Sequence, residues 1–157
     1  MDTVIDNRQK YENYKEQFRR LNKALANGFN LEAMFIEYAI MEDRTESILR
    51  HAGLWEAYLK SRKGRGPTID SKVRYIEKRA ENKSDLLHRY FADDLLANIL
   101  AWKEERNRLI HALLKQQFAH NEISTLAQKG NELVKALRTR SGSYNRAADA
   151  RRETTES

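Results

Sequence analysis

Residues 31–49 of the chain, LEAMFIEYAIMEDRTESIL, indicate most clearly how it folds. Large side chains recur in this stretch at spacings of three and four, which is the period of one face of an α-helix. Asn30 is a suitable N-cap and Gly53 a suitable stop, so we expect a helix from Leu31 to about His51. One narrow stripe of this helix contains Leu31, Phe35, Tyr38, Glu42, Thr45 and Leu49, with Met34 and Ile48 at its edges.

Further helices are expected on both sides of this segment. Upstream, aromatic and leucine side chains at helical spacing precede Gly28, which is expected to end a first helix. Downstream, a short turn over residues 54–59 leads into a basic loop that contains Pro67, and Thr68 or Asp70 is expected to cap the next helix. The sequence therefore predicts five helices, at residues 9–26, 31–51, 69–82, 85–118 and 121–138.

The composition supports an all-α fold. The 157 residues include one proline and six glycines, and 40% of them are hydrophobic. We expect an antiparallel four- to five-helix bundle that forms a single domain over residues 1–140. No large apolar side chain follows Tyr144, so residues 141–157 are expected to form a basic, polar and disordered tail.

The net charge of +6 suits an anionic partner such as RNA, DNA or an acidic protein. It is also compatible with an ordinary soluble protein that has arginine-rich surfaces. No run of 18 apolar residues occurs, and residues 1–6 lack the pattern of a signal peptide. The absence of cysteine is compatible with a reducing cytoplasm, so a cytoplasmic location is expected. No membrane partner is expected, because the chain has no apolar run long enough to span a bilayer. No metal or cofactor site is predicted; His88 and His120 have no partner at ligand spacing.

Two charged residues interrupt apolar helical stripes. Glu42 lies at the centre of the stripe described above, and Arg106 lies within the apolar face of the helix predicted at residues 85–118. A charge in a core stripe is costly unless an opposite charge or a hydrogen bond meets it. We therefore predict that Glu42 and Arg106 pair inside the bundle; the alternative is that each is solvated near a cleft or a helix end.

Arg106 also begins the most informative short motif, the stretch ERNRLIHAL at residues 105–113. Asn107 and His111 are four residues apart and share a helix face, with Arg108 beside them. Arg106 and His111 are five apart, so their directions differ by about 140° on a straight helix. A phosphate site that uses both residues needs a curled arginine side chain or a second copy of the helix across a two-fold axis.

A second arginine–histidine pair, Arg44 and His51, has a spacer of six residues. Arg44 is followed by Thr45, and His51 lies next to the Gly53 stop, where a histidine commonly serves only the helix C-terminus. We therefore prefer the motif at residues 106–111.

An arginine followed by a polar residue and, five positions on, by a histidine resembles the motif of the HEPN superfamily, a group of small helical domains found in toxins, CRISPR effectors and antiviral ribonucleases. The resemblance covers the motif and, loosely, the bundle from Leu31 to Arg138. It implies a symmetric homodimer and a metal-independent endoribonuclease whose motif residues are Arg106, Asn107 and His111. It also implies a toxin–antitoxin or phage-defence setting, with an antitoxin or another regulatory protein as a partner.

One position departs from the family pattern. Related toxins often carry a tyrosine two residues after the histidine, as the acceptor of inactivating adenylylation, whereas this chain has Leu113. Other members of the superfamily are inactive and bind a nucleotide or a partner protein. A non-catalytic interaction domain is therefore the alternative function, and a helical nucleic-acid binder that uses charge alone is the third.

The chemistry expected of the motif is RNA cleavage by the substrate's own 2′-hydroxyl, which leaves a 2′,3′-cyclic phosphate. Histidine is the side chain best suited to proton transfer near neutral pH, so His111 is the candidate for that role. Arg106 or Arg108 would bind the phosphate, and Asn107 would orient the imidazole or donate to a phosphate oxygen. Three basic side chains are predicted to bind RNA, at Lys63, Arg65 and Lys103. An aromatic stripe at Tyr11, Tyr14 and Phe18 is expected to be core or dimer contact rather than a platform for bases.

Overall fold

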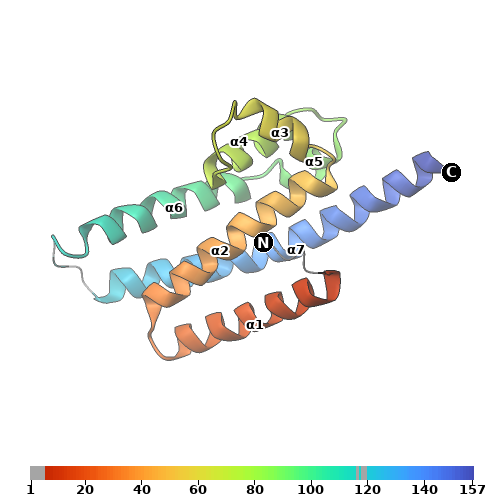
Figure 1. Ribbon diagram of the computed structural model, residues 1–157. Coiled ribbons are helices and arrows are strands. Elements are labelled where there is room, and N and C mark those ends of the chain that lie inside the picture. The colour runs from red at the N-terminus through yellow and green to blue at the C-terminus, as the bar shows by residue number, and fades with distance from the viewer. Residues whose placement is uncertain (1–5, 116, 118–119) are drawn as a thin grey trace.

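The computed structural model describes residues 6–115, 117 and 120–157, apart from the side chain of His120, and over these ranges the regular structure is helical throughout (Figure 1). The all-α bundle predicted from the sequence is confirmed. Within the described ranges, no helix combines the length and the apolarity that crossing a bilayer requires. The helices are α1 Asn7–Ala26, α2 Asn30–His51, α3 Trp55–Ser61, α4 Ile69–Ala80, α5 Leu86–Phe91, α6 Leu95–Ala112 and α7 His120–Glu156.

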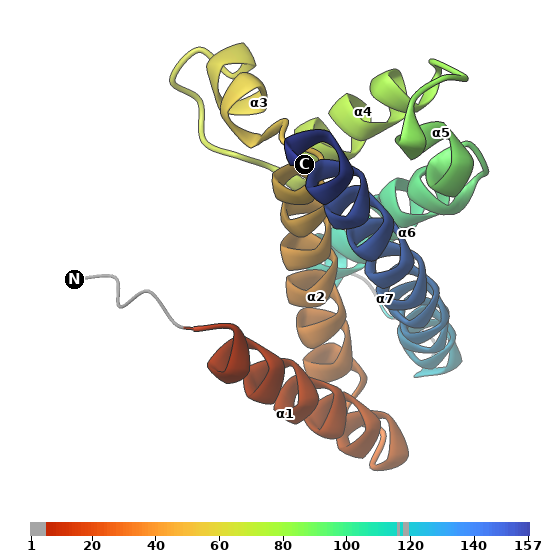
Figure 2. The ribbon, with the colours of Figure 1, turned by 90° about the vertical axis from the view of Figure 1, so that its right-hand side faces the viewer.

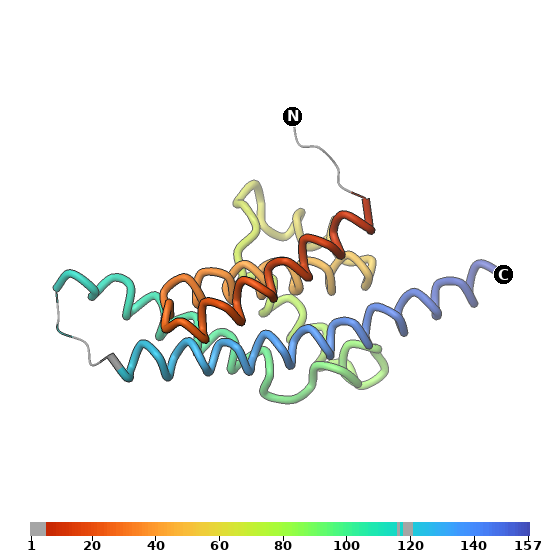
Figure 3. Tube along the Cα trace, turned by 90° about the horizontal axis from the view of Figure 1, so that it is seen from below, coloured from red at the N-terminus to blue at the C-terminus, as the bar shows by residue number. Residues whose placement is uncertain are grey.

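Helices α2 and α7 form the centre of the bundle. They make the most extensive helix–helix contact of the molecule and run side by side in the same direction. Helix α1 packs antiparallel to α2, and α6 packs antiparallel to α7, so that α1 and α6 lie on opposite sides of α2 (Figures 1 and 3). The short helices α3, α4 and α5 cover one end of this arrangement (Figure 2).

The helix ends that the sequence predicted most accurately are those determined by glycine or capping residues next to them. Gly28 (φ 73°) and Gly53 (φ 69°) adopt left-handed backbone conformations directly after α1 and α2, where a side chain would be strained. Thr68 caps α4 through a reciprocal capping box, in which Ser71 N donates to Thr68 Oγ1 (3.2 Å) and Thr68 N donates to Ser71 Oγ (3.2 Å).

The helix predicted to run unbroken over residues 85–118 is divided into α5 and α6. Asp93 lies in the break, where its carboxylate accepts from Leu95 N (3.4 Å) and forms an ion pair with Arg140 of α7. Phe91 and Leu95, on either side of the break, are both buried against the core. The predicted end of this helix, Phe118, lies outside the described residues. The turn expected at residues 54–59 is helix α3.

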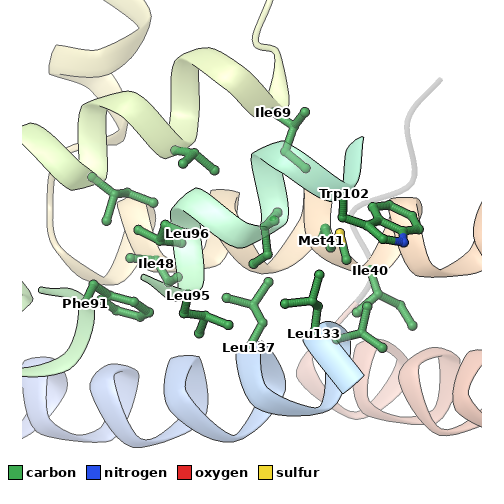
Figure 4. Close-up of a cluster of buried hydrophobic side chains, with 14 of the residues drawn as sticks. Ile40, Met41, Ile48, Ile69, Phe91, Leu95, Leu96, Trp102, Leu133 and Leu137 are labelled. Carbon is green, nitrogen blue, oxygen red and sulfur yellow. The ribbon is translucent and has the colours of Figure 1, made fainter. Parts of the chain in front are cut away.

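The buried face of α2 coincides only in part with the stripe that was centred on Glu42. Thr45 and Leu49 of that stripe are fully buried, as are Met34 and Ile48 at its edges, but Leu31 and Phe35 at its beginning remain 46% and 69% exposed. Helix α2 packs most extensively against α7. Figure 4 shows part of the resulting core, where side chains of α2, α4, α6 and α7 meet.

Residues 141–157 were expected to be disordered; in the structure they continue α7 to Glu156. Tyr144 is buried, and its ring centroid lies 5.8 Å from those of Tyr90 and Phe91. Asn145 Nδ2 donates to Ser47 Oγ (3.1 Å) on α2. The buried ring of Tyr144, the Asn145–Ser47 hydrogen bond and the contacts of Asp149 and Arg152 with His51 of α2 thus hold a segment whose composition alone suggests disorder.

Replacement of Tyr144 with alanine is expected to lower the free energy of unfolding by about 2–4 kcal/mol, because it removes a buried ring from the α5–α7 contact. Urea denaturation followed by circular dichroism measures the change. Arg151→Ala, at an exposed position of the same segment, is the control and should change stability by less than about 0.5 kcal/mol. Equal small changes in the two variants would show that this part of α7 does not dock.

Candidate functional site

The second half of α6 carries the motif, and two buried residues fix its orientation. Trp102 and Leu109 face α7, and Trp102 Nε1 donates to the carbonyl oxygen of Leu126 (2.9 Å). With this face held against α7, Arg106 is directed toward α2 and is half-buried, while His111 is exposed.

Arg106 is a cation that no carboxylate neutralises within the part of the chain that the structure describes. Its guanidinium lies over the ring of Tyr38 (4.5 Å from Cζ to the centroid), and its Nη1 donates to Asn107 Oδ1 (2.9 Å). Its Nε is buried without a hydrogen-bond partner, and among the described residues no carboxylate oxygen lies within 4.0 Å of it. Burial lowers the pKa of Arg106, and the Tyr38 phenol opposes this shift. The side chain thus combines a positive charge, partial desolvation and a free donor.

The predicted pairing of Glu42 with Arg106 is wrong. Glu42 Oε2 accepts from Lys72 Nζ of α4 (2.9 Å), and the same ammonium donates to the Glu42 carbonyl oxygen (2.8 Å). Lys72 is fully buried and needs both acceptors, because an unpaired ammonium in the core is strongly destabilising. Tyr38 takes the place of a carboxylate beside Arg106, where its aromatic face attracts the guanidinium. The pKa of Tyr38 is raised, chiefly by burial and then by the nearby Glu42, while the charge of Arg106 opposes this shift.

The other motif residues lie toward solvent. Asn107 is half-buried and accepts from Arg106, and Arg108 forms an exposed ion pair with Glu105 (3.1 Å). His111 makes no hydrogen bond with the residues that the structure describes. Arg106 contacts Tyr38 of α2, whereas His111 is exposed at the end of α6. Because residues five apart on a helix diverge by about 140°, we do not expect one chain to direct both side chains at a single phosphate.

Of the three residues predicted to bind RNA, Lys103 already forms ion pairs with carboxylates of its own chain. It is buried and pairs with Asp70 and with Glu104 (2.9 Å). Burial alone would lower the pKa of Lys103, but the hydrogen bonds to the two carboxylates outweigh it and raise the pKa. An ammonium that already bridges two carboxylates is a poor ligand for phosphate, so this part of the prediction is not retained. Lys63 and Arg65 lie exposed in the loop between α3 and α4.

Exposed apolar side chains continue from the Arg106–Tyr38 contact toward one end of the molecule. On α2, Phe35 and Leu31 lie on the same face as Tyr38, one and two turns before it. Ile110 near the end of α6 and Leu114 in the turn after it follow Arg106 at spacings of four and are also exposed. Helix α2 begins and α6 ends at the same end of the bundle (Figure 1), so both rows of exposed apolar side chains lie toward that end.

The side chains of the second arginine–histidine pair, Arg44 and His51, form hydrogen bonds with other residues of the chain. Arg44 Nε donates to Tyr14 Oη (2.6 Å), and its Nη2 contacts Asp43 Oδ2 (2.8 Å). His51 Nδ1 and Asp149 Oδ1 lie 2.8 Å apart. Both side chains therefore have partners within the chain, which leaves the motif on α6 as the better candidate.

Sequence reasoning missed two residues near the site. Tyr38 was read only as a member of the apolar stripe, although its position four residues before Glu42 already placed it on the same face. Glu37 is fully buried without a hydrogen-bond partner, and burial raises its pKa to about 9. A signal for Glu37 was present, since it lies between Met34 and Met41 at helical spacing.

The part of the chain that the structure describes contains no group of three or more acidic, histidine or cysteine side chains placed to hold a metal ion. Comparisons with protein-family models, with curated proteins and with solved structures found no match. The geometry of α6 and its neighbours therefore carries the functional argument by itself.

Proposed function

We propose that the chain is a metal-independent endoribonuclease of a toxin or phage-defence type that acts as a homodimer. The observation that carries this proposal is the state of Arg106, five residues before an exposed histidine. Its guanidinium is partly desolvated, and neither its Nε nor its charge has a partner among the hydrogen-bond acceptors and carboxylates of the described residues. A phosphodiester is a suitable counterion for such a group, because a guanidinium donates to two phosphate oxygens in one plane.

In the proposed reaction, the 2′-oxygen of RNA attacks the adjacent phosphorus and the bond from phosphorus to the 5′-oxygen breaks. His111 takes the proton of the 2′-hydroxyl and delivers it to the departing 5′-oxygen. Arg106 stabilises the charge that develops on the phosphate oxygens, and Asn107 holds the guanidinium through the 2.9 Å hydrogen bond. The products are a 2′,3′-cyclic phosphate and a 5′-hydroxyl.

The homodimer is part of the proposal because Arg106 and His111 of one chain diverge. The apolar rows beside Arg106, Phe35 with Leu31 and Ile110 with Leu114, suit a two-fold contact that places the α6 helices of two chains together. Arg106 of one chain then lies opposite His111 of the other.

The same apolar rows favour a second candidate function, a non-catalytic domain that docks a regulatory protein or binds a nucleotide. In that case, Arg106 would anchor the partner or the nucleotide without cleavage. The two functions differ in whether RNA is cut.

The test is incubation of the purified protein with labelled RNA in EDTA. We expect cleavage products that end in a 2′,3′-cyclic phosphate, and no cleavage of DNA or of 2′-O-methyl RNA, which lack the attacking hydroxyl. Intact RNA under conditions in which the protein is folded would favour the interaction domain.

The dimer contact is tested separately with Phe35→Asp. Because Phe35 is exposed, the variant should fold with a stability within about 0.5 kcal/mol of wild type. It should nevertheless shift the protein from dimer to monomer in light scattering and remove cleavage. Ala57→Asp, at an exposed position on α3, is the control and should leave both properties unchanged. A Phe35→Asp variant that stays dimeric would contradict this interface.

A further inference from the structure

A groove of about 530 Å³ is lined by residues of α1, α2 and α7. Helix α1 lies on the side of α2 opposite α6 (Figures 1 and 2). Its lining is strongly basic and contains no carboxylate, with cations contributed by Lys10, Lys15, Arg44, Arg138 and Arg146. Asp43 partly neutralises Lys10 (3.6 Å) and Arg44 (2.8 Å) from beside the groove.

Three of these cations have no counterion among the residues at 6–115, 117 and 120–157. Lys15, Arg138 and Arg146 are exposed, and among the described residues no carboxylate oxygen lies within 4.0 Å of any of them. Arg138 and Arg146 are eight residues apart on α7, a separation of about 12 Å along the helix. Gly142 lies between them on the same face and adds no side chain to the groove wall. Such a wall presents two separated guanidiniums to a ligand that carries more than one negative charge.

Aromatic rings are interleaved with the cations. Arg44 lies over the ring of Tyr14 (4.2 Å), and Arg138 lies over the ring of Phe18 (4.3 Å). The third ring, Tyr11, is 64% exposed. Of the three aromatic residues expected to be core or dimer contacts, Phe18 is buried and Tyr14 is half-buried against the core, whereas Tyr11 is open to solvent.

We propose that this groove binds single-stranded nucleic acid, with phosphates at Lys15, Arg138 and Arg146 and a base stacked on Tyr11. Unpaired cations along a groove together with an exposed aromatic ring are the combination by which proteins hold single strands without reading their sequence. An acidic protein would satisfy the cations but would make no use of an exposed tyrosine ring among them. The groove and the motif on α6 lie on opposite sides of α2, so this binding does not depend on the proposed cleavage.

The experiment measures fluorescence anisotropy of a labelled 2′-O-methyl oligouridine of about 12 nucleotides, which the proposed cleavage reaction cannot cut. The triple variant Lys15→Glu, Arg138→Glu and Arg146→Glu should bind at least about 100-fold more weakly than wild type. Neutralisation of the same three residues with glutamine should reduce the slope of log K against log salt by about 2, since each phosphate contact on a single strand contributes about 0.7. The double variant Lys15→Glu and Arg146→Glu keeps the Arg138–Phe18 contact and should still bind about tenfold more weakly.

The matched control reverses three exposed cations on α4 and in the turn after it, Arg74, Lys78 and Lys83, and should keep most of the affinity. Tyr11→Ala should weaken binding by about tenfold, whereas Tyr11→Phe, which keeps the stacking ring, should bind as wild type does. Equal losses in the groove and control variants would overturn the proposal in favour of a diffuse charge effect. Unchanged binding by Tyr11→Ala, or displacement of the oligonucleotide by polyglutamate at equal charge concentration, would overturn it in favour of a site for acidic protein. Because the probe cannot be cleaved, failure of the ribonuclease proposal would not alter any of these outcomes.

Discussion

A His111→Ala variant is expected to lose RNA cleavage by about 10²–10⁴-fold, which is the range that a positioned proton-transfer group contributes. His111 is exposed and makes no hydrogen bond with the described residues, so its removal should leave the fold and the dimer unchanged. The rate is measured with RNA in EDTA, and circular dichroism and light scattering verify the fold and the dimer. Cleavage that survives the substitution would remove His111 from the mechanism.

Arg106→Lys is the matching test of the guanidinium. Lysine keeps the positive charge but lacks the planar pair of donors, so we expect a loss of at least about tenfold in cleavage with little change in stability. Arg108→Ala is the control from the same turn of α6, because Arg108 is exposed and pairs with Glu105. If Arg106→Lys cleaves as wild type does, the arginine acts only as a point charge.

The two-chain arrangement predicts complementation between inactive variants. In a mixture of His111→Ala and Arg106→Ala chains, about half of the dimers are heterodimers, and each heterodimer contains one site with an intact arginine and an intact histidine. Activity should therefore return to about a quarter of the wild-type value. A mixture that stays inactive would show that each site uses the arginine and the histidine of a single chain.

The sequence was most informative where structure is determined locally. The stops at Gly28 and Gly53 and the cap at Thr68 depend on residues within one turn of each helix end, and all three are in place. The break between α5 and α6 was missed because it depends on Asp93 and its ion pair with Arg140, which is 47 residues away in the chain.

The same limit explains the errors at the site. The stripe through Glu42 correctly identified a charge that needs a partner, but the choice between Arg106 and Lys72 depends on how α4 and α6 lie over α2. Helical period alone does not contain that information. The divergence of Arg106 and His111, in contrast, follows from their five-residue separation on one helix, and the structure directs them accordingly, with Arg106 against α2 and His111 toward solvent.

The second prediction with a large expected effect concerns Glu37. Its carboxyl group is buried in the core and has no hydrogen-bond partner among the described residues. It occupies space that Gly130 of α7 leaves open: a Cβ at residue 130 would overlap the Glu37 carboxyl and approach the ring of Trp102 (2.7 Å). Burial is the cause that raises the pKa of Glu37 from 4.5 to about 9. The folded protein therefore holds this proton at neutral pH, whereas the unfolded chain releases it.

The sign of the pH dependence follows from this difference. Below pH 4.5 both states are protonated at Glu37, and between pH 4.5 and about 9 only the folded state keeps the proton. Folding then takes up one proton, so the contribution of this residue to stability falls as pH rises, by up to about 1.4 kcal/mol per pH unit. The loss is complete once the pH exceeds the folded-state pKa of about 9.

Glu37→Gln keeps the shape of the side chain and removes the titration. We expect the variant to be more stable than wild type by roughly 2–4 kcal/mol at pH 8, and the difference to shrink steadily toward pH 5. Urea denaturation at intervals between pH 5 and pH 8.5 measures both slopes. Glu32→Gln, at an exposed position on the same helix, is the control and should follow the wild-type curve. Parallel curves for wild type and Glu37→Gln would mean that the carboxyl group is ionised in the folded protein, with a counterion or water at Glu37 that lowers its pKa toward 4.5.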